Sequence, residues 1–230
     1  LDLEAALVHG RKSFEPGLLA SAHRGFLYID EVNLLEDHIV DLLLDVAASG
    51  INVVEREGLS VRHASRFVLV GSGNPEEGEL RPQLLDRFGL SVEVTSPTDI
   101  AERIEVVRRR DAYDRDPHAF LDRFKSADGR LRTRIRRAQD LLEKVQCPDD
   151  ALVFASRLCM KLGVDGLRGE LTLLRVARAM AALGGRDEVA ISDMVAAAPS
   201  ALRHRLRRDP LDEAGSTARI ERALSEIREE

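Results

Sequence analysis

Two kinds of apolar spacing alternate over the first 95 residues. Short apolar runs bounded by turn residues predict strands, whereas apolar positions that recur every three to four residues predict helices. Helices are predicted over 3–8 and 33–48, a hairpin over 52–55 and 59–62, and further strands over 25–29, 67–71 and 90–94. Strands that alternate with helices predict a mainly parallel sheet covered on both faces.

The pattern changes after this part of the chain. Ser96, Pro97, Thr98 and Asp99 form a helix-start signal, with proline at the first helical position and an acid three residues after the serine. Helical spacing then recurs over 100–107, 135–145, 152–159, 171–177 and 220–227, with looser connections at 114–129 and 210–216. The sequence therefore predicts an α/β domain over residues 1–95, followed by an all-α domain over 96–230.

The bulk composition is that of an ordinary soluble protein. The chain has 230 residues, of which 44% are hydrophobic and 32% charged. No apolar run approaches the roughly 18 residues of a membrane-spanning helix, and no signal-peptide pattern opens the chain. Cys147 and Cys159 lie outside any CxxC pair and the six histidines are scattered, so we expect neither a disulfide nor a zinc site. These features favour a reducing cytoplasm.

The net charge of −6 argues against a chain that binds nucleic acid. Two local basic runs, at 108–110 and 203–208, stand against this acidic balance. We interpret both runs as solvated helix faces.

The predicted strand over 25–29 ends in two consecutive acids, Asp30 and Glu31. The carboxyl end of a buried strand faces the ligand crevice of an α/β sheet. There Asp30 would hold Mg²⁺, usually through water, and Glu31 would polarise the water that attacks a γ-phosphate, as in a Walker B motif. The alternative is that both acids are solvated and that Glu31 only favours the N-terminus of the next helix.

Asn74 follows the predicted strand over 67–71 and precedes Pro75. A neutral amide at this place can hydrogen-bond the attacking water or the γ-phosphate beside Glu31, which is the role called sensor 1. The alternative is a turn asparagine before a proline, which is common in loops.

Two arginines complete the candidate set. Arg87 ends a short predicted helix and would project into the nucleotide of a neighbouring subunit as an arginine finger, unless it forms a structural salt bridge with Asp86 or another acid. Arg168 lies near the start of a predicted helix, where the macrodipole opposes a cation unless an anion such as a phosphate balances it. Glu170 is an alternative source of that balance.

These candidates together form a single ATPase set. It consists of the acids at one strand end, the amide at the next strand end, the arginine of the short helix and the arginine at the start of a later helix. The segments that carry this set resemble the ATPase subunit of magnesium chelatase, an AAA+ family of chlorophyll and bacteriochlorophyll synthesis; they are 14–20, 28–35, 71–78, 81–89, 165–171 and 205–212. The resemblance extends over essentially the whole chain. It implies a partial P-loop NTPase-type parallel sheet followed by an all-α lid.

The resemblance also implies a function and its partners. The family forms a homo-oligomeric, hexameric ring that uses ATP and Mg²⁺ to drive insertion of Mg²⁺ into protoporphyrin IX. It works with an AAA-like subunit that bears an integrin-type domain and with a porphyrin-binding subunit, so the porphyrin chemistry would lie on another chain. The cytoplasm, or the plastid stroma in a plant or alga, would be the location. The hairpin over 52–62 and the region before Gly25 would be partner-contacting insertions.

The chain departs from the family at the phosphate-binding loop. Family members carry GxxxxGK[ST] upstream of Walker B, whereas none of Lys12, Lys125, Lys144 and Lys161 follows a glycine. We therefore expect a fragment that lacks on the order of 100 residues, about half a domain. By itself it should bind ATP poorly and hydrolyse it hardly at all.

Two alternative functions remain open at this point. One is an AAA+ remodeller of the helicase branch, in which Arg56 and Arg62 of the hairpin would contact DNA with steep salt dependence, although the acidic net charge argues against it. The other is a non-hydrolysing interaction module that docks on full-length subunits, which the absence of the phosphate loop favours.

Overall fold

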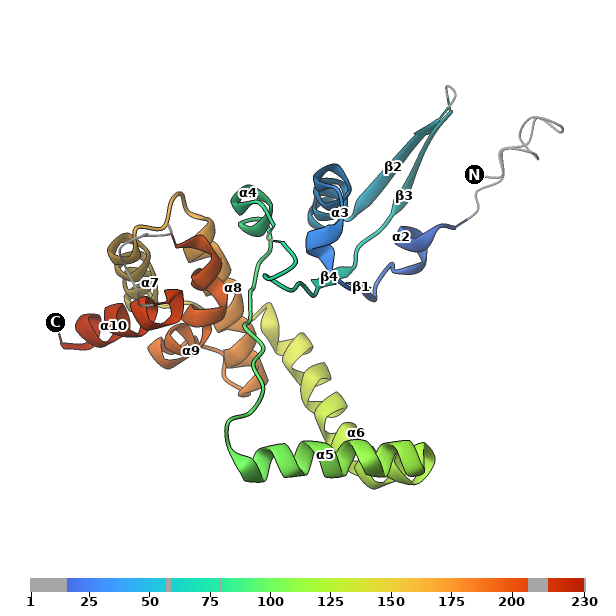
Figure 1. Ribbon diagram of the computed structural model, residues 1–230. Helices are drawn as coiled ribbons and strands as arrows, with labels where there is room; N and C mark the ends of the chain where they lie inside the picture. Colours follow the sequence, from blue (N-terminus) through green and yellow to red (C-terminus); the bar gives the residue numbers. More distant parts are fainter. Residues whose placement is uncertain (1–15, 57–58, 79, 207–214, 230) are drawn as a thin grey trace. The chain divides into compact units, whose positions relative to one another are not determined.

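The computed structural model describes residues 16–56, 59–78, 80–206 and 215–229 (Figure 1). The chain divides into two compact units, residues 1–88 and 89–230. This division falls a few residues before the predicted boundary between 95 and 96. The helix predicted over 3–8, and residues 210–214 of a predicted connection, lie outside the described residues.

The first unit contains a small parallel sheet. Strands β1 (Phe26–Ile29) and β4 (Val68–Gly71) pair in parallel, from Phe26 opposite Val68 to Ile29 opposite Gly71. Helix α3 (Asp37–Ser49) packs on one face, where its Val40 and Leu44 are buried. The expected cover on both faces is not found among the described residues, because the alternate side chains point away from α3 and are exposed, namely Phe26, Tyr28, Val68 and Val70.

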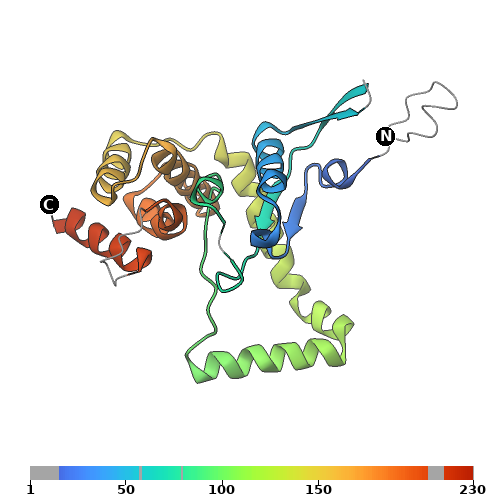
Figure 2. The ribbon, with the colours of Figure 1, turned by 45° about the horizontal axis from the view of Figure 1, so that its top comes forward.

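The predicted hairpin is confirmed. Strands β2 (Ile51–Arg56) and β3 (Leu59–Ala64) are antiparallel, with Ile51 opposite Ala64, and the ribbon extends away from the end of α3 (Figure 2). Gly50 ends α3 with a φ of +70°, the left-handed conformation that glycine adopts at little cost. The short elements of this unit are α2 (Leu18–Ser21), the 3-10 turn η1 (Val32–Leu34) and α4 (Pro82–Leu85).

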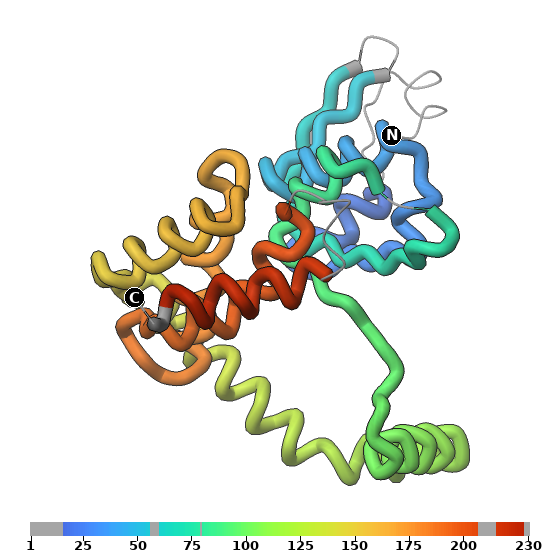
Figure 3. Tube along the Cα trace, turned by 60° about the vertical axis from the view of Figure 1, so that its left-hand side comes forward, coloured from blue at the N-terminus to red at the C-terminus, as the bar shows by residue number. Residues whose placement is uncertain are grey.

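The second unit has a helical core. Helices α7 (Asp149–Leu162), α8 (Arg168–Leu183), α9 (Ile191–Leu202) and α10 (Ser216–Glu229) pack together, and α10 runs against α7 and α9 (Figure 3). The most deeply buried large side chains of this core are Leu158, Leu173, Met194, Leu202 and Ile220. The helices predicted at 152–159, 171–177 and 220–227 are thereby confirmed.

Helix α9 was not predicted from the sequence. Its middle is a run of alanines followed by Pro199, which gives few large apolar positions and includes a residue that disfavours a helix interior. Tertiary packing compensates for this weak local preference for a helix, since Ala197, Ala198 and Ala201 are buried. At the start of the helix, the Asp193 carboxylate accepts a hydrogen bond from the Ala190 N–H at 2.9 Å.

The looser connection expected over 114–129 is wrong. Helix α5 (Ile100–Arg115) is followed at once by α6 (Pro117–Leu142), because Asp116 caps α6 by accepting from the Ala119 N–H at 2.9 Å and Pro117 occupies the first helical position. Gly129 lies inside α6, where glycine costs only about 1 kcal/mol relative to alanine. The cap of α5 is Asp99, rather than the predicted Ser96.

The strand predicted over 90–94 is also wrong. A strand needs a neighbouring strand, and no described residue pairs with this segment in a sheet. It is instead extended along α9, where the Ser91 N–H donates to the Ser200 carbonyl at 2.9 Å.

The described part of the second basic run, residues 203–206, is not the solvated helix face that we expected. Arg205 is buried and donates to the carbonyls of Ala201 and Gly89, at 2.5 and 3.3 Å. Arg203 is 14% exposed and pairs with Glu93 at 3.2 Å. These arginines therefore hold the segment after residue 88 against α9. In the first run, the exposed Arg109 and Arg110 pair with Glu105 and Asp114 on the surface of α5, as a solvated face would.

The cysteines are free thiols, and burial raises the pKa of Cys159 to about 12, so this thiol stays protonated. No helix in the described part of the chain is both long enough and apolar enough to cross a membrane.

Candidate functional site

The carboxyl ends of β1 and β4 meet at Asp30. The Ser72 hydroxyl donates to Asp30 Oδ1 at 2.5 Å, and the Tyr28 hydroxyl donates to the same oxygen at 2.9 Å. These two hydrogen bonds, with that from Ser72 the stronger influence, hold the pKa of Asp30 below its usual value. The result is an exposed carboxylate that stays ionised at neutral pH.

Glu31 is held by the same serine. Its N–H donates to Ser72 Oγ at 3.1 Å, and the next N–H, that of Val32, donates to the Ser72 carbonyl at 2.8 Å. Glu31 has a φ of +53°, a left-handed conformation that costs a residue other than glycine about 1–2 kcal/mol. Such strain persists where the surroundings fix it, as the hydrogen bond to Ser72 does here.

Asn33, which the sequence analysis missed, links the two strand ends. Its Nδ2 donates to the carbonyls of Asn74 and Gly78, at 3.3 and 3.1 Å. Its Oδ1 is buried without a hydrogen-bond partner in the described structure, and a Cβ added to Gly73 would lie 2.9 Å from it. A side chain at position 73 would therefore force the Asn33 amide to shift. The available signal was a polar residue inside the apolar run of residues 32–35.

The side chain of Asn74 stabilises its own turn. Its Oδ1 accepts from the Glu76 N–H at 3.1 Å, and its Nδ2 donates to Glu77 Oε1 at 3.4 Å. This is the turn arrangement that formed the alternative interpretation. Its loop is tied to that of Asp30 and Glu31 through Asn33, but no hydrogen bond between described residues joins its amide to either acid. The sensor 1 role stays a prediction.

Arg87 is engaged by two acids on α3. Its two terminal nitrogens donate to Asp41 and Asp45, which lie one helical turn apart, and its side chain is 26% exposed. The structural salt bridge of the alternative interpretation is therefore present, with these acids in place of Asp86. The arginine-finger role stays a prediction.

Arg168 is the first residue of α8, as the sequence predicts, and it is exposed. It belongs to the second unit, whereas Asp30, Glu31, Asn74 and Arg87 belong to the first. The next residue, Gly169, is tightly packed, since a Cβ there would lie 2.9 Å from a methyl carbon of Val164.

The strand-end site fits a magnesium–nucleotide complex in part. An ionised, exposed Asp30 with Glu31 beside it offers the carboxylate oxygens that Mg²⁺ prefers. In the described ranges no group of three or more His, Cys, Asp and Glu side chains could hold a metal ion, but Mg²⁺ bound with a nucleotide uses only one or two carboxylates, together with phosphates and water. The sequence itself offers no Gly-Lys pair for a phosphate cradle.

Comparison with known proteins gives a consistent result. The family profile "Magnesium chelatase, subunit ChlI" matches residues 3–83, and the profile "AAA lid domain" matches residues 154–224. The magnesium-chelatase 38 kDa subunit of Acidiphilium rubrum is 66% identical over 227 residues, which cover 99% of this chain and 66% of that protein. That of Cereibacter sphaeroides is 65% identical, over 99% of this chain and 68% of that protein. The chain thus spans about two thirds of the length of these relatives.

A solved structure supports the fold. A crystal structure described as that of an ATPase from Cytophaga hutchinsonii superposes with a TM-score of 0.61, at 22% identity, over 87% of this chain and 64% of that chain. At this identity the likeness concerns the fold alone, which is the AAA+ arrangement of a parallel sheet followed by a helical lid. With two relatives at about 65% identity over nearly all of its residues, the chain belongs to the magnesium chelatase 38 kDa, or ChlI-type, subunit family.

Proposed function

We propose that this chain belongs to the motor subunit of magnesium chelatase, which couples ATP hydrolysis to insertion of Mg²⁺ into protoporphyrin IX. The relatives named as magnesium-chelatase subunits support this proposal. The structural observation that carries it is the double contact of Ser72 with Asp30 and Glu31, because it fixes two acids at the edge of the sheet where nucleotide chemistry takes place in α/β folds.

Each predicted site residue then has a distinct role. Bound Mg–ATP supplies the γ-phosphate and the metal charge that stabilises its transfer. Asp30, kept ionised by Ser72 and Tyr28, holds the metal, and Glu31 accepts a proton from the attacking water.

The remaining polar residues act on the phosphate. Asn74 orients the attacking water, and Arg168 binds the phosphate from the lid. Arg87 serves a neighbouring subunit, which requires it to leave Asp41 and Asp45.

The proposal includes the assembly. The subunit forms a homo-oligomeric, hexameric ring and acts with an AAA-like subunit bearing an integrin-type domain and with a porphyrin-binding subunit. The cytoplasm, or the plastid stroma, is the proposed location; a relative from Glycine max, 51% identical, is named as chloroplastic.

The direct test is Glu31→Gln in the complete native subunit. ATP binding should remain, while turnover should fall on the order of 100-fold or more, since a general base contributes about that much. The matched control is Glu76→Gln, an exposed glutamate in the loop after β4, which should leave turnover unchanged. Equal turnover in the two variants would refute the role of Glu31.

The role of Arg87 as an arginine finger is tested by mixing altered and unaltered subunits. Subunits carrying Arg87→Ala, added to unaltered subunits, should depress activity by more than simple dilution, because each altered subunit also impairs its neighbour. A strictly proportional loss contradicts a role across the interface. The thermal midpoint of the variant must be measured alongside, since Arg87 also pairs with Asp41 and Asp45.

A further inference from the structure

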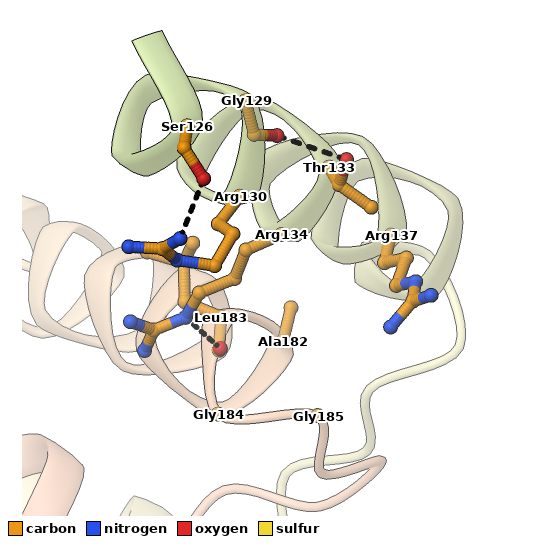
Figure 4. Close-up of a pocket in the computed structure, with 10 residues that line it drawn as sticks. All are labelled: Ser126, Gly129, Arg130, Thr133, Arg134, Arg137, Ala182, Leu183, Gly184 and Gly185. Carbon is orange, nitrogen blue, oxygen red and sulfur yellow. Dashed lines mark hydrogen bonds between the residues drawn. The ribbon is translucent and has the colours of Figure 1, made fainter. Parts of the chain in front are cut away.

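We propose that a groove between α6 and the end of α8 binds an acidic peptide segment of a partner protein. The groove encloses about 640 Å³ and receives three arginines from α6, namely Arg130, Arg134 and Arg137 (Figure 4). Its opposite wall is the last turn of α8 and the glycines that follow, from Ala182 to Gly185. It lies wholly in the second unit and contains no predicted residue of the ATPase site, so the inference is independent of the proposed function.

The three arginines share one face of α6. Residues four and seven apart lie close in angle around a helix, and their Cα atoms are separated by about 6 and 10 Å along its axis. Arg134 is held in place by a hydrogen bond from its Nε to the Leu183 carbonyl at 2.9 Å. Leu183 is the last residue of α8, so this bond supplies a partner to a carbonyl at the end of that helix. Arg130 donates to Ser126 Oγ at 2.9 Å. In Figure 4 the Arg137 guanidinium points away from the other two.

No carboxylate neutralises these three side chains among the described residues. Helix α5 is different, because its arginines at 109, 110 and 115 each pair with an acid one turn away, at 2.8 to 3.1 Å. Like charges one turn apart repel one another, so the face of α6 is stabilised by whatever anion reaches it. The chemistry of the groove thus favours a negatively charged occupant.

The shape favours carboxylates that are spread along a chain. The guanidinium groups do not converge on one point, as they would around a single phosphate. Of the four residues of the opposite wall, Leu183 alone has a side chain larger than a methyl group, so a peptide backbone can approach closely at Gly184 and Gly185. Alternate side chains of an extended peptide are about 7 Å apart, close to the rise of about 6 Å between Arg130 and Arg134.

The test uses a fluorescein-labelled octaglutamate peptide, with binding to the full chain followed by fluorescence anisotropy. The variant Arg130→Gln/Arg137→Gln removes two groove charges and leaves Arg134, which supports α8. The matched control is Arg132→Gln/Arg136→Gln, which removes the same charge from the same helix, at two arginines that line a separate depression on its other face. Both pairs are exposed, and unchanged thermal midpoints would show that the fold is intact.

The groove variant should bind the peptide on the order of tenfold more weakly, whereas the control should change by less than about twofold. Equal weakening in both variants would overturn the proposal, since it would show non-specific attraction to a basic helix. Absence of peptide binding by the unaltered chain would also overturn it. So would displacement of the peptide by tripolyphosphate or a single-stranded oligonucleotide at lower concentration than by unlabelled octaglutamate, because the site would then select phosphates.

Discussion

The two units of the chain rely on different interactions. In the second unit, four helices enclose a continuous apolar core, with Leu158, Leu173 and Met194 inaccessible to solvent. In the first, the main buried cluster of the described residues has four members, Val32, Val40, Leu44 and Leu84. Two of the predicted catalytic residues of this unit, Glu31 and Asn74, lie beyond strand ends, where hydrogen bonds involving Ser72 and Asn33 position the chain.

This difference shows how a site can be specific without being buried. Burial of apolar surface is strong but non-directional, whereas hydrogen bonds impose geometry on named atoms. Core substitutions should therefore alter the stability of the second unit, and strand-end substitutions should alter ionisation and geometry in the first.

The largest expected effect comes from the helical core. Leu158→Ala removes a side chain with no solvent exposure and should lower the free energy of unfolding by about 2–5 kcal/mol, as measured by urea denaturation. The control on the same helix is Leu152→Ala, whose side chain is 40% exposed, and it should cost much less. If both variants cost the same, the core is not organised as described.

The second effect is that of a buried charge at the start of α9. Asp193 binds Arg186 through both carboxylate oxygens, at 2.6 and 2.8 Å, so Asp193→Asn should cost about 1.5–3 kcal/mol at pH 7. Arg186 holds the pKa of Asp193 below its usual value. The carboxylate therefore stabilises the fold above its unfolded pKa of about 3.9, and this contribution is lost as the pH falls through the lower folded value.

The measurement is denaturation of both proteins at pH 7 and near pH 3. The stability difference between the unaltered chain and Asp193→Asn should shrink at the lower pH. A difference that stays constant with pH would mean that the ionised carboxylate contributes nothing.

The third effect concerns two glycines within helices, whose substitution by alanine should change the stability of the fold in opposite directions. Gly169→Ala should destabilise by about 1–3 kcal/mol, because its Cβ would lie 2.9 Å from Val164 and 3.3 Å from both Cys159 and Leu202. Gly129→Ala should stabilise by up to about 1 kcal/mol, since nothing lies within 4 Å of its Cβ. Thermal unfolding measures both, and the same sign for the two substitutions would contradict the packing of α8.

The smallest effect is confined to the strand-end site. Ser72→Ala should raise the pKa of Asp30 toward its usual value, because it removes the hydrogen bond with the greatest influence, and Tyr28→Phe should raise this pKa less. Titration of Asp30 followed by NMR reports both. A larger rise for Tyr28→Phe would reverse the order of the two contributions.

Much of the fold was predictable because it depends on near neighbours in the sequence. The runs over 25–29 and 67–71 gave β1 and β4, and turn residues at 57–58 gave the hairpin. Helices with mostly polar surfaces were harder to predict from the sequence. Helices α5 and α6 are stabilised by capping at Asp116 and by ion pairs, which apolar spacing does not reveal.

Of the candidate site, the sequence determined which residues stand at the strand ends and at the start of α8, because strand ends and helix starts follow from local patterns. Only the tertiary structure decided their partners. Arg87 meets Asp41 and Asp45, and Ser72 meets Asp30 and Glu31, across more than forty residues of chain in each case. Such contacts depend on how distant segments pack, and no local propensity encodes that packing. The family was readable from the sequence, whereas the arginine groove of α6 became visible only when α8 was placed beside it.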